Sequence, residues 1–402
     1  MDETLPKGTI SIAKNVFWVG IKHHNRRLFD ALIPLPHGTS YNSYLVVGSE
    51  KIALIDTVNP GFEGELLEKI AQHVDPSKID YVIMNHAEPD HANAGQHVLK
   101  VATKAKLVTS QKGKEASLIY FGVDESRITV VEDGGKIDLG GKTLEFIYAP
   151  WLHWPETMFT YLVEDKILFP CDFFGQHIAS GEFFADEVGN EVVIDMAKLY
   201  FAEIMMPFRK PCLDAIEKLK KRDIRIIAPS HGVMYKDPKI IVDAYTDWAG
   251  EKMKRKVLVA YVSMWGSTER MVNVLTESLI KKGIDVRIFD LPNSDIGHVA
   301  KELVDSPVVV VGAPTVLAGV HPVAAYATML VKALRAPTRY AAVLTSHGWS
   351  GGAVKALQDI LAGTKIEIIG AVDAKGKPTE KDIEDVLKLA DKIAEKLEQF
   401  GH

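Results

Sequence analysis

Several features that define other protein classes are scarce in this sequence of 402 residues. It has only two cysteines, Cys171 and Cys212, which excludes a disulfide framework and a CxxC pair. An iron–sulfur or rubredoxin-type centre needs more cysteine ligands, so it would have to lie on another protein. The longest apolar runs, such as "SPVVVVGAP", are too short to cross a bilayer, so a membrane-spanning protein is not expected.

An excess of basic residues is also missing. The chain has 47 Lys and Arg against 53 Asp and Glu, a formal net charge of -6. Without a basic surface, nucleic acid is not an expected partner. The first residues, "MDETLPKGTISIAK", are acidic and lack an apolar core, so they do not resemble a secretory signal. We therefore expect a cytoplasmic protein.

The pattern of predicted strands and helices changes about two thirds of the way along the chain. Before that point, short strand-like runs such as "NVFWVG", "KIALIDT", "DYVIMNH" and "KTLEFIYAP" alternate with turns and a few helical stretches. After "AYTDWAGEKMKRK", five apolar strands alternate with amphipathic helical patterns, which indicates a doubly wound parallel sheet of flavodoxin size. We predict an α/β protein with two domains, residues 1–252 and 253–402.

Potential metal ligands cluster in "MNHAEPDHANAG", residues 84–95, and further ones follow other apolar strands. Loops at the carboxyl ends of different strands can converge on one centre. The residues concerned are His86, Glu88, Asp90, His91, His153, Asp172 and His231. Seven ligands exceed the needs of one zinc ion and suit two metals, with Asp172 as the natural bridging carboxylate. The alternative for any one of the histidines is an ordinary core or surface position.

The pattern "HAEPDH" resembles the metal motif of the metallo-β-lactamase superfamily, whose hydrolases usually carry His-x-His-x-Asp-His and bind zinc. Here Glu88 stands at the second histidine position. A carboxylate in place of an imidazole shifts the metal preference from zinc towards iron or manganese. With "APWLHWPETMFTY", "CDFFGQHIAS" and "APSHGVMY", the chain resembles flavodiiron proteins over essentially its whole length.

This resemblance implies a metallo-β-lactamase-like αββα domain with two irons, followed by a flavodoxin-like domain that binds FMN. It implies that His86, Glu88 and His153 bind one iron, that Asp90, His91 and His231 bind the other, and that Asp172 bridges them. His91 is the variable ligand, because the equivalent histidine stays off the metal in some relatives.

Near this centre, His24 and Tyr200 are predicted catalytic residues. The family usually has an acidic residue near His23, where this chain has "KHH". His23 and His24 could act as proton donors or could simply lie in an exposed loop. Tyr200 could lie near the metal pocket or could be an ordinary aromatic residue of the core. His177 belongs to the family pattern without an assigned role.

The loop "AYVSMWGSTERM" joins a strand to a helix and offers hydroxyls and a helix N-terminus to a phosphate. It resembles the flavodoxin loop that holds the FMN phosphate, although a helix cap alone would explain its Ser and Thr residues. Two later strand ends occupy positions that embrace the flavin ring in flavodoxin-like domains, and Trp349 would lie near the ring. The predicted FMN residues are Ser263, Met264, Trp265, Gly266, Ser267, Thr268, Pro314, Thr315, Val316, Leu317, Ala318, Gly319, Ser346, His347, Gly348, Trp349, Ser350 and Gly351.

Two irons and FMN on one chain imply electron transfer from a partner through the flavin to a small gaseous substrate. Flavodiiron proteins reduce dioxygen to water or nitric oxide to nitrous oxide. The resemblance implies rubredoxin or an NAD(P)H-linked reductase as donor, and a head-to-tail homodimer or a dimer of dimers. The alternatives are a zinc hydrolase with an attached flavodoxin domain, against which Glu88 argues, and an electron carrier with a vestigial iron site.

Overall fold

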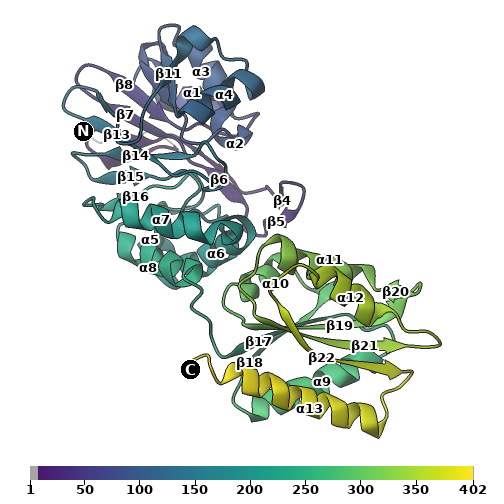
Figure 1. Cartoon of the computed structure of the whole chain (residues 1–402). Coiled ribbons are helices and arrows are strands. Elements are labelled where there is room, and N and C mark those ends of the chain that lie inside the picture. The colour runs from purple at the N-terminus through teal and green to yellow at the C-terminus, as the bar shows by residue number, and fades with distance from the viewer. Residues whose placement is uncertain (1–7, 402) are drawn as a thin grey trace. The chain divides into compact units, whose positions relative to one another are not determined.

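A computed structural model describes residues 8–401, which form two compact units (Figure 1). The first contains the residues up to Tyr200 together with Phe208–Thr246, and the second contains Phe201–Pro207 and the residues from Asp247 on. The expected division into residues 1–252 and 253–402 stays a prediction. Among the described helices, none combines the length and the apolar character that crossing a membrane requires.

The first unit is built on two sheets. The larger sheet is mixed, in the strand order β1-β2-β7-β8-β9-β10-β11. Its strands are β1 (Ile10–Ala13), β2 (Val16–Trp18), β7 (Tyr44–Val47), β8 (Ile52–Ile55), β9 (Tyr81–Ile83), β10 (Lys106–Thr109) and β11 (Ile128–Val130). The second sheet has the order of its numbering: β12 (Lys136–Asp138), β13 (Thr143–Tyr148), β14 (Met158–Leu162), β15 (Ile167–Phe169) and β16 (Ile226–Ile227). Two short pairs complete the unit: β3 (Ile21–His23) with β6 (Thr39–Tyr41), and β4 (Leu28–Phe29) with β5 (Ile33–Pro34).

The helices of this part of the chain lie outside the two sheets (Figure 1). They are α1 (Glu63–Ala71), α2 (Pro89–Ala92), α3 (Gly95–Val101), α4 (Gln111–Tyr120), α5 (Ala185–Val188), α6 (Asn190–Tyr200), α7 (Arg209–Leu219) and α8 (Pro238–Ala249). Buried side chains such as Tyr44 and Phe146 fill the space between the sheets, and Leu54 and Leu66 belong to the core under α1. The result is an αββα sandwich, in which each sheet buries both of its faces.

Strand direction brings the predicted ligands to one edge. β8, β9 and β10 run parallel, and β9 ends immediately before the segment that carries His86. β15 and β16 also run parallel; Asp172 follows β15 and His231 follows β16. Because parallel strands end at the same edge of a sheet, residues far apart in the sequence meet there.

The second unit contains a parallel sheet in the order β18-β17-β19-β21-β22, the order of flavodoxin-like folds. Its strands are β17 (Lys256–Tyr261), β18 (Asp285–Asp290), β19 (Val308–Val316), β21 (Tyr340–His347) and β22 (Glu367–Lys375), and the short β20 (Gly319–Val320) pairs with β19. Helices cover both faces (Figure 1). They are α9 (Ser267–Lys281), α10 (Ile296–Leu303), α11 (Pro322–Ala333), α12 (Ala353–Leu361) and α13 (Glu380–Leu397).

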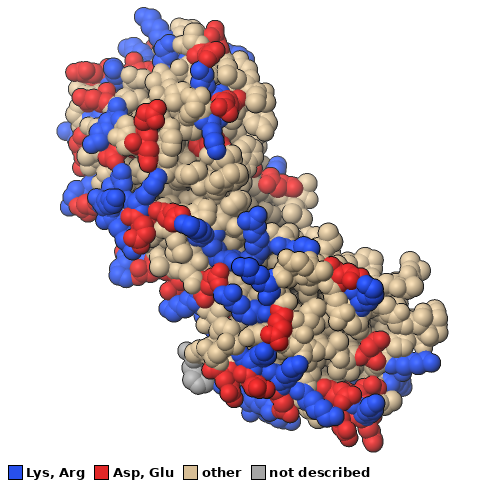
Figure 2. Space-filling model, viewed as in Figure 1, with Lys and Arg blue, Asp and Glu red and all other residues tan. Residues whose placement is uncertain are grey.

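Acidic and basic side chains are interspersed over the face that Figure 2 shows. This mixture fits the small formal net charge of -6. A surface of this kind carries no strong field of one sign over that face, so charge alone does not define a binding surface there.

Candidate metal centre and flavin cavity

One group of candidate ligands consists of His86, Glu88, His153 and Asp172. Nε2 of His86 lies 3.2 Å from Oε2 of Glu88 and 3.4 Å from Oδ2 of Asp172. Nε2 of His153 lies 3.0 Å and 3.5 Å from the same two oxygens. Two imidazole nitrogens and two carboxylate oxygens therefore face one point, with the spacing that ligands of a single metal ion adopt.

A second group consists of Asp90, His91 and His231. Nε2 of His231 lies 3.3 Å from Oδ2 of Asp90, and Nε2 of His91 lies 3.4 Å from Oδ1 of Asp90. The other oxygen of Asp172, Oδ1, lies 2.9 Å from Nε2 of His91 and 3.4 Å from Nε2 of His231. Asp172 thus presents one oxygen to each group, which is the geometry of a bridging carboxylate.

Hydrogen bonds on the far side of two imidazoles select the nitrogen that faces the centre. Nδ1 of His231 lies 2.6 Å from the backbone oxygen of Ser40, which can only accept, so Nδ1 carries the proton. Nδ1 of His86 lies 2.7 Å from Oε1 of Glu156. In both rings Nε2, the atom that points to the centre, is therefore the nitrogen that can supply a lone pair to a metal, as in metal-binding histidines generally.

The carboxylate oxygens of Asp90 and Asp172 lack, among the described residues, the hydrogen-bond partners that would neutralise them, so they are better suited to binding metal ions. Both oxygens of Asp90 and of Asp172 are buried without a well-formed hydrogen bond from any described residue, although Nε2 of His91 is close to Asp172. Buried carboxylates without partners are costly unless a cation neutralises them. Three acids and four imidazoles, all on one edge, fit two iron ions.

Cys171 also lies beside His91 and Asp172, which sequence reasoning did not consider. Its sulfur accepts a hydrogen bond from Oγ of Ser230 at 3.3 Å. Burial raises the pKa of the Cys171 thiol well above its usual value. Without a metal, Cys171 is therefore a neutral, buried thiol.

The histidines and acids of the centre shift one another's pKa values strongly. Burial disfavours charge on His86, but hydrogen bonds to Glu156 and Glu88 outweigh it and hold its pKa well above the usual value. Burial likewise opposes charge on His91, but Asp90 and Asp172 raise its pKa to about 9. Burial works against ionisation of Asp172 too, and His91 nevertheless holds its pKa well below the usual range.

These shifts predict that metal binding releases protons. A metal takes the lone pair that a proton occupies on His91 below about pH 9, and the raised pKa of His86 acts in the same direction, so metal affinity should rise as the pH increases towards 9. Titration of iron-free protein with Zn²⁺ at pH 7, by calorimetry in buffers of different ionisation enthalpy, should show about two protons released per chain. A pH-independent affinity between pH 6 and 8 would contradict the raised pKa values.

The other residues predicted near the centre differ in position. The Tyr200 ring is buried, with its centroid 4.9 Å from that of His177 and 6.0 Å from that of His231. His177 is bonded through Nδ1 to Oγ1 of Thr39 at 2.9 Å. His24 is exposed, and within residues 8–401 no ring contact joins it to a candidate ligand. The structure therefore places Tyr200 and His177 beside the candidate ligands, whereas His24 does not contact them.

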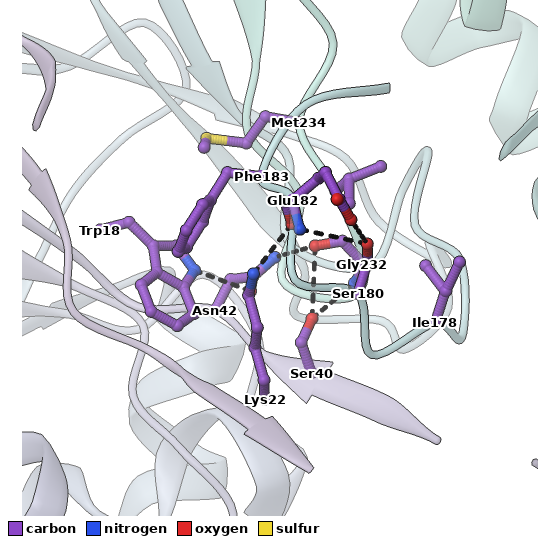
Figure 3. Close-up of a pocket in the computed structure, with 11 residues that line it drawn as sticks. Trp18, Lys22, Ser40, Asn42, Ile178, Ser180, Glu182, Phe183, Gly232 and Met234 are labelled. Atoms are coloured by element: carbon purple, nitrogen blue, oxygen red, sulfur yellow. Dashed lines mark hydrogen bonds between the residues drawn. The ribbon is translucent and has the colours of Figure 1, made fainter. Parts of the chain in front are cut away.

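A polar network around Gly232, which follows His231 in the chain, fixes the loop that carries both residues (Figure 3). Oγ of Ser40 accepts from the backbone N–H of Gly232 at 2.6 Å, and Asn42 donates to the Gly232 oxygen at 2.9 Å. Lys22 donates to the backbone oxygens of Gly181 and Glu182, at 2.9 and 2.8 Å, on the loop after His177. Burial lowers the pKa of Lys22 to about 8. The cavity between these residues is only about 10 Å³, so we interpret the network as a support for the centre.

A cavity of about 530 Å³ opens at the carboxyl ends of the strands in the second unit. Most of the predicted FMN residues line it, but Gly266, Thr268, Val316, Gly319 and Gly351 are not among the lining residues. Thr268 is buried, and its hydroxyl is hydrogen-bonded to that of Ser346 at 3.0 Å. Gly266 shapes the loop instead: its φ of 82° begins α9 in a conformation that glycine adopts without strain. The size and position of the cavity suit a flavin mononucleotide.

Sequence reasoning missed residues at both sites. Gly376 and Lys377, in the turn between β22 and α13, line the flavin cavity. Glu156 and Ser40 hold the outer nitrogens of His86 and His231. A backbone oxygen leaves no signal in a sequence, whereas a glutamate inside "HWPETM" could have been noticed as an acid next to a ligand loop.

Comparisons with known proteins identify the two domains. Residues 39–232 match the family model described as ODP family beta lactamase, and residues 259–389 match that of flavodoxin. A nitric oxide reductase of Moorella thermoacetica is 36% identical over 394 residues, which cover 96% of this chain and 98% of the relative. The rubredoxin-oxygen oxidoreductase of Megalodesulfovibrio gigas is 34% identical, over 94% of this chain and 96% of the relative.

Solved structures show the same architecture. That of the rubredoxin oxygen:oxidoreductase from Desulfovibrio gigas superposes with a TM-score of 0.93 and 34% identity, over 97% of this chain and 98% of the other. The flavodiiron protein from Giardia intestinalis gives a TM-score of 0.91 and 32% identity, over the same shares of the two chains. The predicted fold class, β-lactamase-like and then flavodoxin-like, is confirmed. The chain therefore belongs to the flavodiiron protein family: it is an oxidoreductase whose cofactors are a diiron centre and FMN.

Proposed function

We propose that this chain reduces dioxygen to water, nitric oxide to nitrous oxide, or both. The observation that carries the proposal is the pair of ligand groups that share Asp172, one on each of its oxygens. Two iron ions held by these groups would together supply electrons to one small gaseous substrate. The proposed ligands are His86, Glu88 and His153 for one iron, Asp90, His91 and His231 for the other, and Asp172 as the bridge.

The iron pair and FMN, when bound, supply the electrons, and the protein supplies shape and protons. Tyr200 and Phe29 place rings against His177 and His231 and keep this side of the centre apolar. Burial and the neighbouring His231 hold the pKa of His177 well below its usual value, so its ring is neutral. Nδ1 of His177 is hydrogen-bonded to Thr39, while Nε2 has no partner among residues 8–401 and is free to form a hydrogen bond with a bound molecule.

In the second unit, we propose that FMN occupies the cavity at the strand ends. The loop before α9 provides hydroxyls and backbone N–H groups for the phosphate, since the helix N-terminus favours an anion. The side chain of Trp349 lines the cavity and is 92% exposed, so its ring is available to cover a flavin.

Trp349→Ala is expected to weaken FMN binding about threefold to tenfold, the worth of one aromatic contact, with little change in stability. Fluorescence titration of FMN into flavin-free protein measures this effect. Ile280→Ala provides a control, because Ile280 is exposed on α9 and does not line the cavity. Equal FMN affinity in wild type and Trp349→Ala would place the flavin ring elsewhere in the cavity.

We further propose a cytoplasmic, head-to-tail homodimer, as such or within a dimer of dimers. Large apolar residues are exposed beside each site. Ile119 and Tyr120 are 77% and 60% exposed at the end of α4, where the Tyr120 ring contacts Trp154 next to His153. Trp265, Leu317 and Trp349 line the flavin cavity and are almost fully exposed. Contact between these two kinds of surface, on different copies, would cover both.

The proposed electron donor is rubredoxin or an NAD(P)H-linked reductase. Curated relatives also include a coenzyme F420H(2) oxidase of Methanothermobacter marburgensis, 32% identical over 95% of this chain, so reduced F420 is a third candidate. Each donor can be compared by the rate at which it reduces the bound flavin under anaerobic conditions. The fastest donor at equal concentration would be the preferred partner.

The decisive experiment is a side-by-side assay of fully reduced enzyme with limiting dioxygen and with limiting nitric oxide, together with metal analysis. Consumption of at least one gas by protein containing about two irons and one FMN per chain supports the proposal. Stoichiometric zinc with esterase activity and no gas consumption would favour the hydrolase alternative. Flavin reduction without reaction with either gas would favour a simple electron carrier.

A further inference from the structure

The inner ligands of the two proposed iron positions are matched in charge. Each position has one carboxylate and two imidazoles of its own, Glu88 at one and Asp90 at the other, and each takes one oxygen of Asp172. From these ligands alone, the two irons would have similar affinities for an electron. Any difference between them has to come from groups outside this shell.

The outer groups are not matched. At the first position, Nδ1 of His86 meets the carboxylate of Glu156 at 2.7 Å. Glu156 is buried and is held in place by the backbone N–H of Ala87, 3.0 Å from the same oxygen. At the second position, Nδ1 of His231 meets the neutral backbone oxygen of Ser40, and Nδ1 of His91 has no partner among residues 8–401.

A carboxylate at this place changes the imidazole that it contacts. It draws the Nδ1 proton towards itself, which makes the ring a stronger donor through Nε2. Its negative charge also acts through a buried, weakly polarisable surrounding and not through water. Both effects stabilise the more highly charged ferric ion at the metal position of His86 relative to the ferrous ion.

We propose that Glu156 is a positioning residue that makes the two irons electronically unequal. The iron of His86, Glu88 and His153 is the harder to reduce, so a half-reduced centre holds its ferric ion there and its ferrous ion beside His231. The inference rests on the proposed ligands, but not on which gas the enzyme reduces. It gives the two irons different tasks: the position of His231 accepts the first electron and the position of His86 the second.

Asp56 is the other buried acid close to the centre and serves as a matched control. Its carboxylate accepts hydrogen bonds from the backbone and side chain of Asn85, at 2.8 and 2.9 Å, and within the described chain no candidate ligand is hydrogen-bonded to it. Burial raises the pKa of Asp56 to about 6, while His91 opposes the rise. Its φ of 50° is one that asparagine tolerates, so Asp56→Asn removes a buried acid without backbone strain, at the cost of one hydrogen bond from Asn85.

The test is a redox titration of the iron- and FMN-loaded protein, in which the mixed-valent centre is followed by electron paramagnetic resonance. Glu156→Gln keeps the shape and an accepting oxygen for Ala87 and His86, but removes the charge. It should raise the second iron potential towards the first and lower the comproportionation constant about tenfold, which corresponds to about 59 mV. Wider separation of the two potentials would instead place the ferric ion beside His231 and overturn the inference.

Two further variants separate charge from packing. Glu156→Asp keeps the charge with a shorter reach, so it should retain more of the wild-type separation than Glu156→Gln. If Glu156→Gln loses iron, the loss should be confined to one ion per chain, because a lost outer partner weakens its own position about 10–100-fold. Equal changes in Glu156→Gln and Asp56→Asn, or loss of both irons from Glu156→Gln, would overturn the inference.

The proposed function can fail separately. The titration contains neither dioxygen nor nitric oxide, so its result does not depend on turnover. A wild-type protein with two irons at equal potentials overturns the role of Glu156 and leaves gas reduction intact. Unequal irons that respond to Glu156→Gln, in a protein that consumes neither gas, would support the inference and contradict the proposed function.

Discussion

Asp172→Asn is expected to reduce gas consumption at least about a thousandfold while FMN stays bound. The substitution removes one negative charge between two cations and turns an amide N–H towards one of them. Removing one partner of a buried charged pair costs about 3–5 kcal/mol, and about 4 kcal/mol in a barrier corresponds to three powers of ten in rate. The flavin should be unaffected, because its cavity is lined entirely by residues from Ser263 to Lys377.

Steady-state consumption of dioxygen and of nitric oxide, with iron analysis and the flavin absorption spectrum, measures this prediction. Asp165→Asn is a suitable control, because Asp165 precedes the same strand, β15, at its other end and pairs with Lys142 at 2.5 Å. It removes an acid without approaching the centre. Near-normal turnover of Asp172→Asn with both irons bound would show that Asp172 is not the bridge.

The parts of the fold with a strong periodic signal were predictable from the sequence. Five apolar strands alternating with helical patterns predicted the flavodoxin-like sheet, and the structure has these strands in the 2-1-3-4-5 order of that fold. The short strands β3 to β5 were not predicted. They have only two or three residues each and contain polar residues such as Lys22, so they are recognisable only through their partners.

The residues of the candidate site also fall into those that the sequence predicts and those that it does not. Inner ligands such as His86 and Glu88 are conspicuous, because several acids and histidines follow apolar strands within a few residues. Their supports are less conspicuous: Glu156 follows the ligand His153 closely but is 70 residues from His86, the residue it contacts, and Ser40 is 191 residues from His231. A hydrogen bond to a backbone oxygen has no side-chain signature, and Lys377 comes from a turn without a motif. Only the folded chain brings these groups together.

Two inactive variants are expected to restore activity to each other in a mixed dimer. Asp172→Asn keeps its FMN but lacks a working iron centre. Ser267→Asp keeps its irons but should lose FMN, because Ser267 lines the cavity at the start of α9 and its new charge would repel the phosphate. Thr268 is unsuitable for this purpose, since it is buried and an aspartate there would disturb the fold.

In a head-to-tail dimer, the flavin of the Asp172→Asn chain would face the irons of the Ser267→Asp chain, so one of the two pairs in each mixed dimer is whole. Random reassociation makes about half of the dimers mixed, and gas consumption should recover to about a quarter of wild type. Each variant dissociated and reassociated alone is the control and should stay inactive. Electron transfer within a single chain predicts no recovery, because the Asp172→Asn chain has no working irons to receive electrons and the Ser267→Asp chain has no flavin to deliver them. Mixed dimers demonstrated by differently tagged chains, but without activity, would therefore contradict the head-to-tail arrangement.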